Sequence, residues 1–303
     1  MKMTLYLPLV LILIFSSACS AIDTFKPTPT PIPMEVLTSL PYNEDHFRQK
    51  LDIYLPSIGE KPYPTILAIH GGGFTSRSKE LYQEIGPHYA QEGYALIAIN
   101  YRLTPGDSYP AQVEDAFCAL AWVHANHEEY GFDPNRVVVM GGSAGGYLAA
   151  MLSTVDNPNI YLEDCPYDYP SGRALHAGVI YYGFYDFTNI EDFPDSEVDG
   201  PLTMFWGANY EEIPPERLEE MSPIKHIDGS EPPFILLHGT ADDTIPSVMS
   251  ERFAESLTQA GVDVELILLP DVGHAFEVKP LDSEEMALPL RKIEAFLNRV
   301  LEQ

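Results

Sequence analysis

The chain has 303 residues, of which 17 are lysine or arginine and 45 are aspartate or glutamate, so its formal net charge is −28. A charge of this sign repels nucleic acids and anionic membrane surfaces at long range, which excludes nucleic-acid binding as the expected function. The length suffices for one large α/β domain with a substantial buried core and requires no second full domain.

The first 18 residues have the pattern of a signal peptide. Lys2 supplies a positive charge, residues 5–15 are apolar, and small residues precede Cys19. The apolar segment is shorter than a transmembrane helix requires. Cys19 resembles the lipidated cysteine of bacterial lipoproteins, but Ser16 stands where those proteins usually have leucine, so ordinary cleavage after Ala18 stays open. We expect an exported protein that is either secreted or attached to a membrane only through a lipid on Cys19.

Residues 19–40 predict a lipoprotein-type N-terminus followed by a stalk. The stretch 26–33 reads Lys-Pro-Thr-Pro-Thr-Pro-Ile-Pro, and such a sequence stays extended and cannot pack into a core. We therefore place the catalytic domain at residues 41–303.

The domain contains two further cysteines, Cys118 and Cys165. In an oxidising exported setting two remaining cysteines favour a disulfide, although a sequence does not show whether their Cα atoms come within bridging distance. Neither cysteine lies in a turn motif or has a histidine nearby in sequence, so a catalytic thiol lacks support.

Strands and helices alternate along the domain, which predicts an α/β fold with a mostly parallel sheet and helices on both faces. Residues 51–55 alternate apolar and polar side chains, as an antiparallel edge strand does. Apolar runs typical of strands buried on both faces lie at 65–69, 95–99, 137–139, 177–182, 234–237 and 264–269. Helical patterns lie at 82–92, from Pro110 to Gly131, and at 144–153, 248–260 and 284–301.

Residues 183–228 show no clean period, and aromatic side chains lie among acidic ones there. Long irregular insertions of this kind are usually functional. We expect the part from Phe184 to Tyr210 to shape a pocket for the acyl or alcohol group of a substrate.

Four motifs follow directly on predicted strands. They are HGGGF at 70–74, GGSAGG at 141–146, HGTADD at 238–243 and VGHAF at 272–276. Because the carboxyl ends of parallel strands share one edge of a sheet, residues from these motifs are expected to meet there. The strand, glycine-flanked serine and helix around Ser143 follow the order of a nucleophile elbow.

The residue types in these motifs fit nucleophilic catalysis. Ser143 would attack a carbonyl carbon while His274 takes its proton, and Asp242 would orient the imidazole and stabilise its charged form. Asp243 is the alternative acid, because sequence cannot separate adjacent carboxylates. Backbone N–H groups of the glycines after His70, together with that of Ala144, can stabilise the oxyanion.

Other polar residues near these motifs have structural interpretations. His70 is expected to brace the glycine loop, and His238 to support the loop that carries the acid. Arg102 and Asp115 are expected to form a scaffold ion pair near the site rather than to act in catalysis. The sequence contains no metal-ligand cluster, so no metal is expected.

Together with Asn100-Tyr101-Arg102-Leu103, these motifs resemble the hormone-sensitive-lipase-like and bacterial feruloyl-esterase-like (BD-FAE-type) carboxylesterases of the α/β-hydrolase superfamily. The resemblance covers about residues 45–300. It implies hydrolysis of a small-molecule carboxylic ester through an acyl-serine, without a cofactor, and it assigns the oxyanion donors to Gly72 and Gly73, with Gly71 as a possible substitute. One departure is Gly142, where the lipase-like branch often has aspartate.

Three alternatives stay open. Peptidases of the prolyl-oligopeptidase type use the same triad, but they carry a large propeller domain for which this chain has no room. An aryl-formamidase-type amidase also fits the glycine loop. A non-catalytic binding module of the same fold is the third, although such proteins typically lose the nucleophile.

Overall fold

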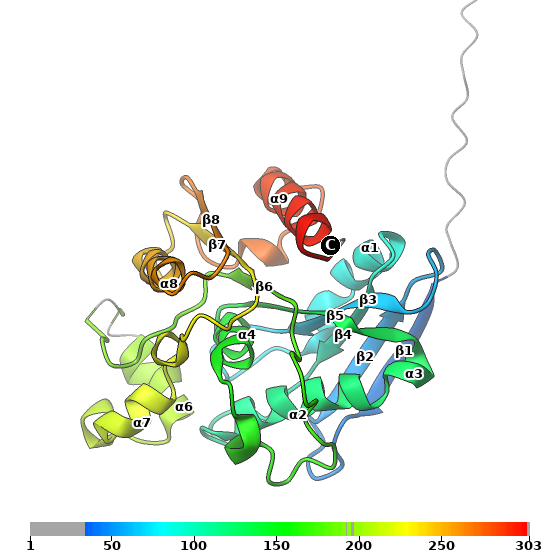
Figure 1. Ribbon diagram of the computed structural model, residues 1–303. Coiled ribbons are helices and arrows are strands. Elements are labelled where there is room, and N and C mark those ends of the chain that lie inside the picture. The colour runs from blue at the N-terminus through cyan, green and yellow to red at the C-terminus, as the bar shows by residue number, and fades with distance from the viewer. Residues whose placement is uncertain (1–33, 192, 195–196, 302–303) are drawn as a thin grey trace, which may run out of the picture. The chain divides into compact units, whose positions relative to one another are not determined.

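The computed structural model describes residues 34–191, 193–194 and 197–301 (Figure 1). In this part of the chain, eight strands form one sheet in the order β1-β2-β4-β3-β5-β6-β7-β8. β2 is antiparallel to both β1 and β4, and the strands from β4 to β8 are mutually parallel. The strands are β1 (Glu35–Pro41), β2 (Lys50–Leu55), β3 (Tyr63–Ile69), β4 (Ala95–Ile99), β5 (Phe132–Gly142), β6 (Ala177–Tyr181), β7 (Phe234–Gly239) and β8 (Val264–Leu269).

Helices connect the strands and cover both faces of the sheet. The α-helices are α1 (Ile85–Gln91), α2 (Ala111–Ala125), α3 (His127–Tyr130), α4 (Ala144–Thr154), α6 (Thr203–Trp206), α7 (Pro215–Glu220), α8 (Val248–Gln259) and α9 (Glu284–Leu301). Short helical turns are η1 (Lys79–Tyr82), η2 (Pro158–Tyr161), η3 (Val198–Leu202), η4 (Tyr210–Glu212), η5 (Pro223–His226) and η6 (Phe276–Val278). The predicted α/β fold is confirmed.

The central strands bury both of their faces. In β3, Leu67 and Ile69 belong to a core shared with α2, α4 and α8, whereas Ile66 and Ala68 belong to a second core shared with α1 and α9. Figure 1 shows α2 on one side of the sheet and α1 and α9 on the other. Since successive side chains of a strand point to opposite faces, a continuous apolar run is what this position demands.

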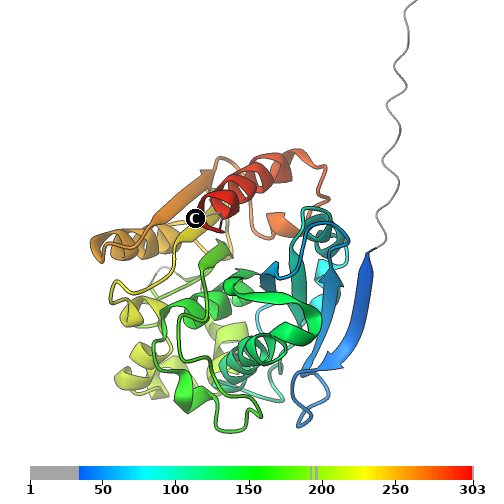
Figure 2. The same cartoon turned by 45° about the vertical axis from the view of Figure 1, so that its right-hand side comes forward.

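The N-terminal edge differs from the prediction. Residues 51–55 were expected at the sheet edge, but β1 pairs outside them and forms the edge itself (Figure 2). The sheet therefore begins at Glu35, and the predicted domain start at residue 41 is too late. β1 is largely exposed, so it carries no apolar pattern that could reveal it. The predicted Cys19 anchor and most of the predicted stalk lie outside the described residues.

Three other segments depart from a regular helix or strand. The helix expected at 82–92 is divided into η1 and α1. β5 contains an irregularity around Asp133 and Pro134, and it pairs with β3 on both sides of it, from Tyr63–Phe132 to Thr65–Val137. The insertion after β6 folds into short helices, η3 to η5, that lack a sustained period.

Cys118 of α2 and Cys165, which follows η2, form a disulfide with a Cα–Cα distance of 5.5 Å. The bond attaches the exposed loop 156–173 to a buried helix. It closes a loop with a sequence separation of 47 residues.

We expect that replacing both cysteines by alanine lowers the free energy of unfolding by about 2–4 kcal/mol, because the unfolded chain regains the entropy of the open loop. Urea denaturation of the wild type and of this double variant measures the difference. Reductant should lower the midpoint of the wild type and leave that of the variant unchanged. A variant as stable as the oxidised wild type would contradict the expectation.

Candidate active site

Ser143 lies at the sharp turn between β5 and α4. Its backbone has φ +56° and ψ −123°, a conformation that is strained for a residue with a side chain. Its N–H donates to the carbonyl of Tyr181 in β6, and its carbonyl accepts from the N–H of Tyr147 in α4. Hydrogen bonds to β6 and to α4 therefore hold the turn. The strand–serine–helix arrangement is that of a nucleophile elbow.

Glycines allow this turn because α4 approaches the sheet very closely. A Cβ on Gly145 would lie 2.0 Å from the carbonyl oxygen of Ile69, and a Cβ on Gly141 would lie 2.3 Å from the carbonyl oxygen of Gly145. Real Cβ atoms do not come this near to backbone oxygen. Any side chain at these positions would push the helix away from the strands.

The structure brings Ser143, His274 and Asp242 into one hydrogen-bonded chain. His274 Nε2 lies 3.1 Å from Ser143 Oγ, and His274 Nδ1 lies 2.7 Å from Asp242 Oδ2. Since a carboxylate can only accept, Nδ1 carries the proton and Nε2 is free to accept one from the serine hydroxyl. The His274 side chain is 18% exposed, whereas that of Asp242 is 0% exposed.

Asp242 is held by several donors. Its Oδ1 accepts from the N–H groups of Thr244 at 2.9 Å and Ile245 at 2.8 Å. Burial by itself would raise the pKa of Asp242, but hydrogen bonds from His238, His274 and the Ile245 N–H outweigh it and hold that pKa well below its usual range. The carboxylate is therefore ionised at neutral pH. The alternative acid, Asp243, is exposed and does not take this place.

The glycine loop lies directly against the elbow. A Cβ on Gly71 would lie 2.8 Å from the Gly142 carbonyl oxygen and 3.3 Å from Ser143 Cβ. Gly72 has φ +111°, and its carbonyl accepts from the N–H groups of Thr75 and Ser76, which closes the loop. Among the described residues, no acceptor contacts the N–H groups of Gly72, Gly73 or Ala144.

His70 supports this loop, as the sequence predicted. Its Nδ1 donates to the Gly71 carbonyl at 2.7 Å, and its ring stacks on Tyr101 with centroids 4.3 Å apart. Burial lowers the pKa of His70 to about 3 against the opposing effect of the Gly71 hydrogen bond, so the ring is neutral. His238 is likewise structural: Nε2 donates to the Ile245 carbonyl and Nδ1 accepts from Ser250 Oγ, both at 2.7 Å.

The insertion after β6 reaches the site through few residues. A Cβ on Gly73 would lie 3.2 Å from Pro201 of η3, and burial raises the pKa of Glu197, which also interacts electrostatically with His274 and Asp242. Most aromatic residues of the insertion instead pack behind the site, where Phe184 stacks on Tyr147 and others complete a buried cluster, namely Phe187, Phe193, Phe205 and Trp206.

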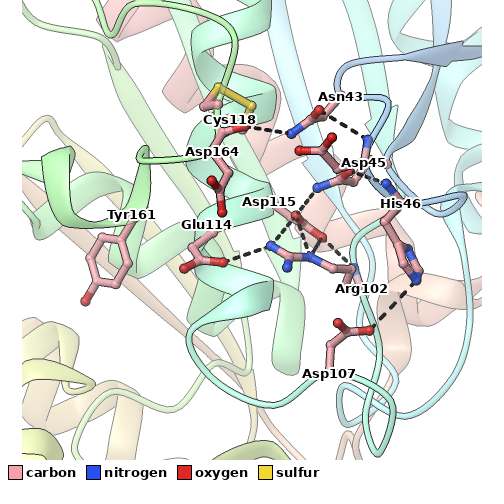
Figure 3. A pocket seen from close by; sticks show the side chains of 12 residues that line it. Asn43, Asp45, His46, Arg102, Asp107, Glu114, Asp115, Cys118, Tyr161 and Asp164 are labelled. Atoms are coloured by element: carbon pink, nitrogen blue, oxygen red, sulfur yellow. Dashed lines mark hydrogen bonds and ion pairs between the residues drawn. A yellow bond between two sulfur atoms is a disulfide. The ribbon is translucent and has the colours of Figure 1, made fainter.

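The Arg102–Asp115 pair lies elsewhere. Arg102 donates from Nε to Asp115 and from a terminal nitrogen to Glu114, and the pair lines a cavity of about 180 Å³ (Figure 3). None of the residues lining this cavity is Ser143, Asp242 or His274. The predicted scaffold pair is present, but it lines this separate cavity rather than the candidate active site. Within the described residues, no group of three or more histidine, cysteine or carboxylate side chains could hold a metal ion.

Sequence reasoning missed two side chains beside the elbow, Glu277 of η6 and Tyr182 after β6. A Cβ on Gly142 would lie 2.7 Å from Glu277 Oε1 and 3.1 Å from the Tyr182 hydroxyl. The Tyr182 ring lies 4.5 Å from that of His274, between centroids. No motif marks these residues, although Glu277 lies only three positions after His274.

Replacing Gly145 by alanine is expected to destabilise the fold by about 3 kcal/mol or more, because the new methyl group collides with the Ile69 carbonyl. The matched control is Gly172→Ala, which adds a methyl group where no described atom lies within 4 Å and should change stability by less than about 1 kcal/mol. Urea denaturation measures both. Equal stability of the two variants would contradict the close approach.

Three comparisons show which known proteins the chain is similar to. Residues 51–257 match the model of the BD-FAE family, a range that includes Ser143 and Asp242 and ends before His274. The chain is 31% identical over 239 residues to the probable carboxylic ester hydrolase LipM of Mycobacterium tuberculosis, which covers 78% of this chain and 54% of LipM. The chain thus spans about half the length of this curated relative.

Solved structures give the same result. Esterase 2 of Thermogutta terrifontis, phosphoramylated by tabun, is 27% identical with a TM-score of 0.70, and the match covers 90% of this chain and 96% of that chain. A truncated carbohydrate esterase from gut microbiota is 23% identical with a TM-score of 0.76, covering 90% of this chain and 98% of that one. The second likeness supports the fold alone.

Proposed function

The chain belongs to the BD-FAE family and has the α/β-hydrolase fold, and from this premise we propose that it hydrolyses carboxylic esters through an acyl-serine intermediate. The observation that carries the proposal is the continuous hydrogen-bonded chain from Ser143 through His274 to Asp242 at a nucleophile elbow. The curated relative LipM is described as a probable carboxylic ester hydrolase, which supports the same reaction class.

In the first step, Ser143 Oγ attacks the ester carbonyl carbon while His274 Nε2 removes the hydroxyl proton. The carbonyl oxygen becomes an oxyanion next to the N–H groups of Gly72, Gly73 and Ala144, which have no other described acceptor. When the tetrahedral intermediate collapses, His274 gives the proton to the departing alkoxide. A water molecule, activated by the same imidazole, then hydrolyses the acyl-serine.

Asp242 has two roles in this mechanism. Its hydrogen bond keeps the His274 proton on Nδ1, and its negative charge stabilises the imidazolium that forms in each transition state. The second role requires an ionised carboxylate, which agrees with the lowered pKa of Asp242.

The tabun adduct of the similar esterase from Thermogutta terrifontis supports a reactive nucleophile in an esterase of this fold. An organophosphate transfers its phosphoryl group only to an activated nucleophile. At the matching elbow of this chain, the nucleophile would be Ser143.

We expect the mature domain to hydrolyse chromogenic esters and Ser143→Ala to lower kcat by a factor of at least about 10⁴, since a missing nucleophile leaves only binding and oxyanion stabilisation. A series from acetyl to long acyl and feruloyl esters, with a formamide and a peptide alongside, measures the substrate class. Cleavage of the formamide or the peptide in preference to every ester would favour an amidase or peptidase. No cleavage by the folded wild type would favour a binding module.

A second prediction separates the two adjacent acids. Asp242→Asn should lower kcat by about 10⁴, because an amide can donate to Nδ1 and stabilise the wrong imidazole tautomer. Asp243→Asn is the matched control, since its exposed carboxylate does not contact His274, and it should retain wild-type kcat and KM. Steady-state kinetics at pH 7.5 measures both. A large loss in the Asp243 variant instead would contradict the assignment.

The pocket wall is also part of the proposal. Pro201 lies next to Gly73, and the aromatic cluster behind Tyr147 is filled by its own side chains, so we expect η3 to contact the bound ester. The rates along the acyl series measure how much room this wall leaves.

For the cellular site, we propose export with attachment through Cys19. The apolar leader, the Pro/Thr-rich stretch and the Cys118–Cys165 disulfide support an oxidising compartment. No helix within the described residues has the length and apolar character to cross a bilayer. Fatty-acid labelling of the full chain and of Cys19→Ser, followed by detergent partitioning, tests the lipid anchor, and equal labelling of both would contradict it.

A further inference from the structure

Glu277 is a buried carboxyl group that the proposed mechanism does not use. It lies in η6, only 5% exposed, and its Oε2 has no hydrogen-bond partner among the described residues. An ionised carboxylate without partners is costly to bury, so such a group either pairs or becomes neutral. No cation pairs with Glu277 in the described part of the chain, which favours the neutral form.

The location of Glu277 connects it to the proposed nucleophile. Gly142 immediately precedes Ser143, and the space that a side chain at Gly142 would occupy is already filled by Glu277 Oε1 and the Tyr182 hydroxyl. Tyr182 contacts the imidazole of His274 and has a positive φ of +36°, so its ring is held in place by the surrounding structure. Its hydroxyl also lacks a partner among the described residues.

The charged and titratable groups around Glu277 are few. Burial raises its pKa to about 8, while the backbone N–H groups of Glu277 and Val278 and the charge of Arg77 oppose this rise. Tyr82 of η1 and Tyr181 of β6 face it and interact with it electrostatically. Glu277 is one of the residues that line a cleft, together with Glu80, Glu84 and Lys279.

We propose that Glu277 is a positioning residue of the ester hydrolase: its uncharged carboxyl group fills the space beside Gly142 and Tyr182 and thereby keeps Ser143 and His274 in hydrogen-bond contact. The inference rests on the proposed function, because it assigns a task at the same site.

Ionisation of Glu277 would place a second negative charge beside the elbow. That charge opposes the oxyanion that forms on attack, and its Oε2 has no hydrogen-bond partner among the described residues. Activity should therefore fall as pH rises through 8. Stability should follow the same sign: the folded state keeps the proton between the ordinary carboxyl value of 4.5 and about 8, whereas the unfolded chain releases it, so stability decreases as pH rises across this interval.

Two variants test the geometric part. Glu277→Ala leaves a gap beside the elbow and should lower kcat 10- to 100-fold at pH 6.5 with KM changed less than threefold, because a displaced nucleophile lowers the rate of chemistry more than binding. Glu277→Gln has the same shape and no charge, so it should restore most of the lost kcat. An alanine variant within threefold of wild-type kcat, or a glutamine variant as slow as alanine, would overturn the proposal.

The pH dependence tests the charge. Wild-type kcat, corrected for spontaneous hydrolysis, should decline with an apparent pKa near 8, and Glu277→Gln should abolish this decline. The thermal midpoints of the two proteins should change in parallel below pH 5 and diverge between pH 5 and 9, where only the wild type loses stability. An identical alkaline decline in both proteins would overturn the proposed charge effect.

The control is Glu231→Gln. Glu231 is buried to a similar extent, at 7% exposure, but it precedes β7, far from the carboxyl end of that strand, and both its oxygens accept backbone N–H groups. This variant should keep the wild-type pH profile of kcat. A folded wild type that hydrolyses no ester at any pH would overturn the proposed function and this inference together, whereas active wild type with an equally active alanine variant would overturn this inference alone.

Discussion

The close approach of α4 to the ends of β3 and β5 is the constraint on which the rest of the site depends. Gly145 brings the first turn of α4 onto the Ile69 carbonyl, at the point where β3 passes into the glycine loop. One contact therefore fixes the distance between the serine turn and the loop whose N–H groups face it. With a side chain at Gly145, the two would separate even if every other residue stayed the same.

The parallel sheet brings the side chains of the candidate active site together. β5, β7 and β8 are parallel, so the residues that follow them emerge at one edge, and His274 meets both Ser143 and Asp242 across 131 and 32 positions of sequence. The loop after β7 is itself tightly held, because Asp242 accepts two backbone N–H groups and His238 bonds the Ile245 carbonyl. The acid is fixed before it contacts the imidazole.

Some of these features depend on local sequence patterns and others on tertiary contacts, and only the first kind can be predicted from the sequence. Buried parallel strands are continuous apolar runs, and β4 was predicted with its observed bounds because burial of both faces dictates its pattern. α9 was likewise predicted with its observed bounds, because one of its faces is apolar and buried. The motifs that bring Ser143, Asp242 and His274 together follow those strands directly. β1 escaped prediction because it is exposed, and the short helices η3 to η5 escaped because tertiary contacts of aromatic side chains, rather than a helical period, hold them.

Glu277 and Tyr182 could not have been found by pattern for a different reason. Their significance comes from an absent side chain, since Gly142 leaves a space that residues from η6 and from the end of β6 occupy. Glycine at that position was noticed in the sequence only as a departure from the lipase-like pattern. Which groups fill the space depends on three elements at once, and no single stretch of sequence contains that information.

Three carboxyl groups at the candidate active site, those of Asp242, Glu277 and Glu197, differ in the effect of their surroundings. Donors hold Asp242 ionised, whereas burial raises the pKa values of Glu277 and Glu197. Environments that push the pKa values of neighbouring carboxyl groups apart in this way give those groups different roles. The negative charge of Asp242 lies on the side of the imidazole remote from Ser143, where in the proposed mechanism it stabilises the imidazolium. A second fixed charge at Glu277 would lie beside the elbow and oppose the oxyanion of the proposed mechanism, so that mechanism needs Glu277 protonated as well as Asp242 ionised.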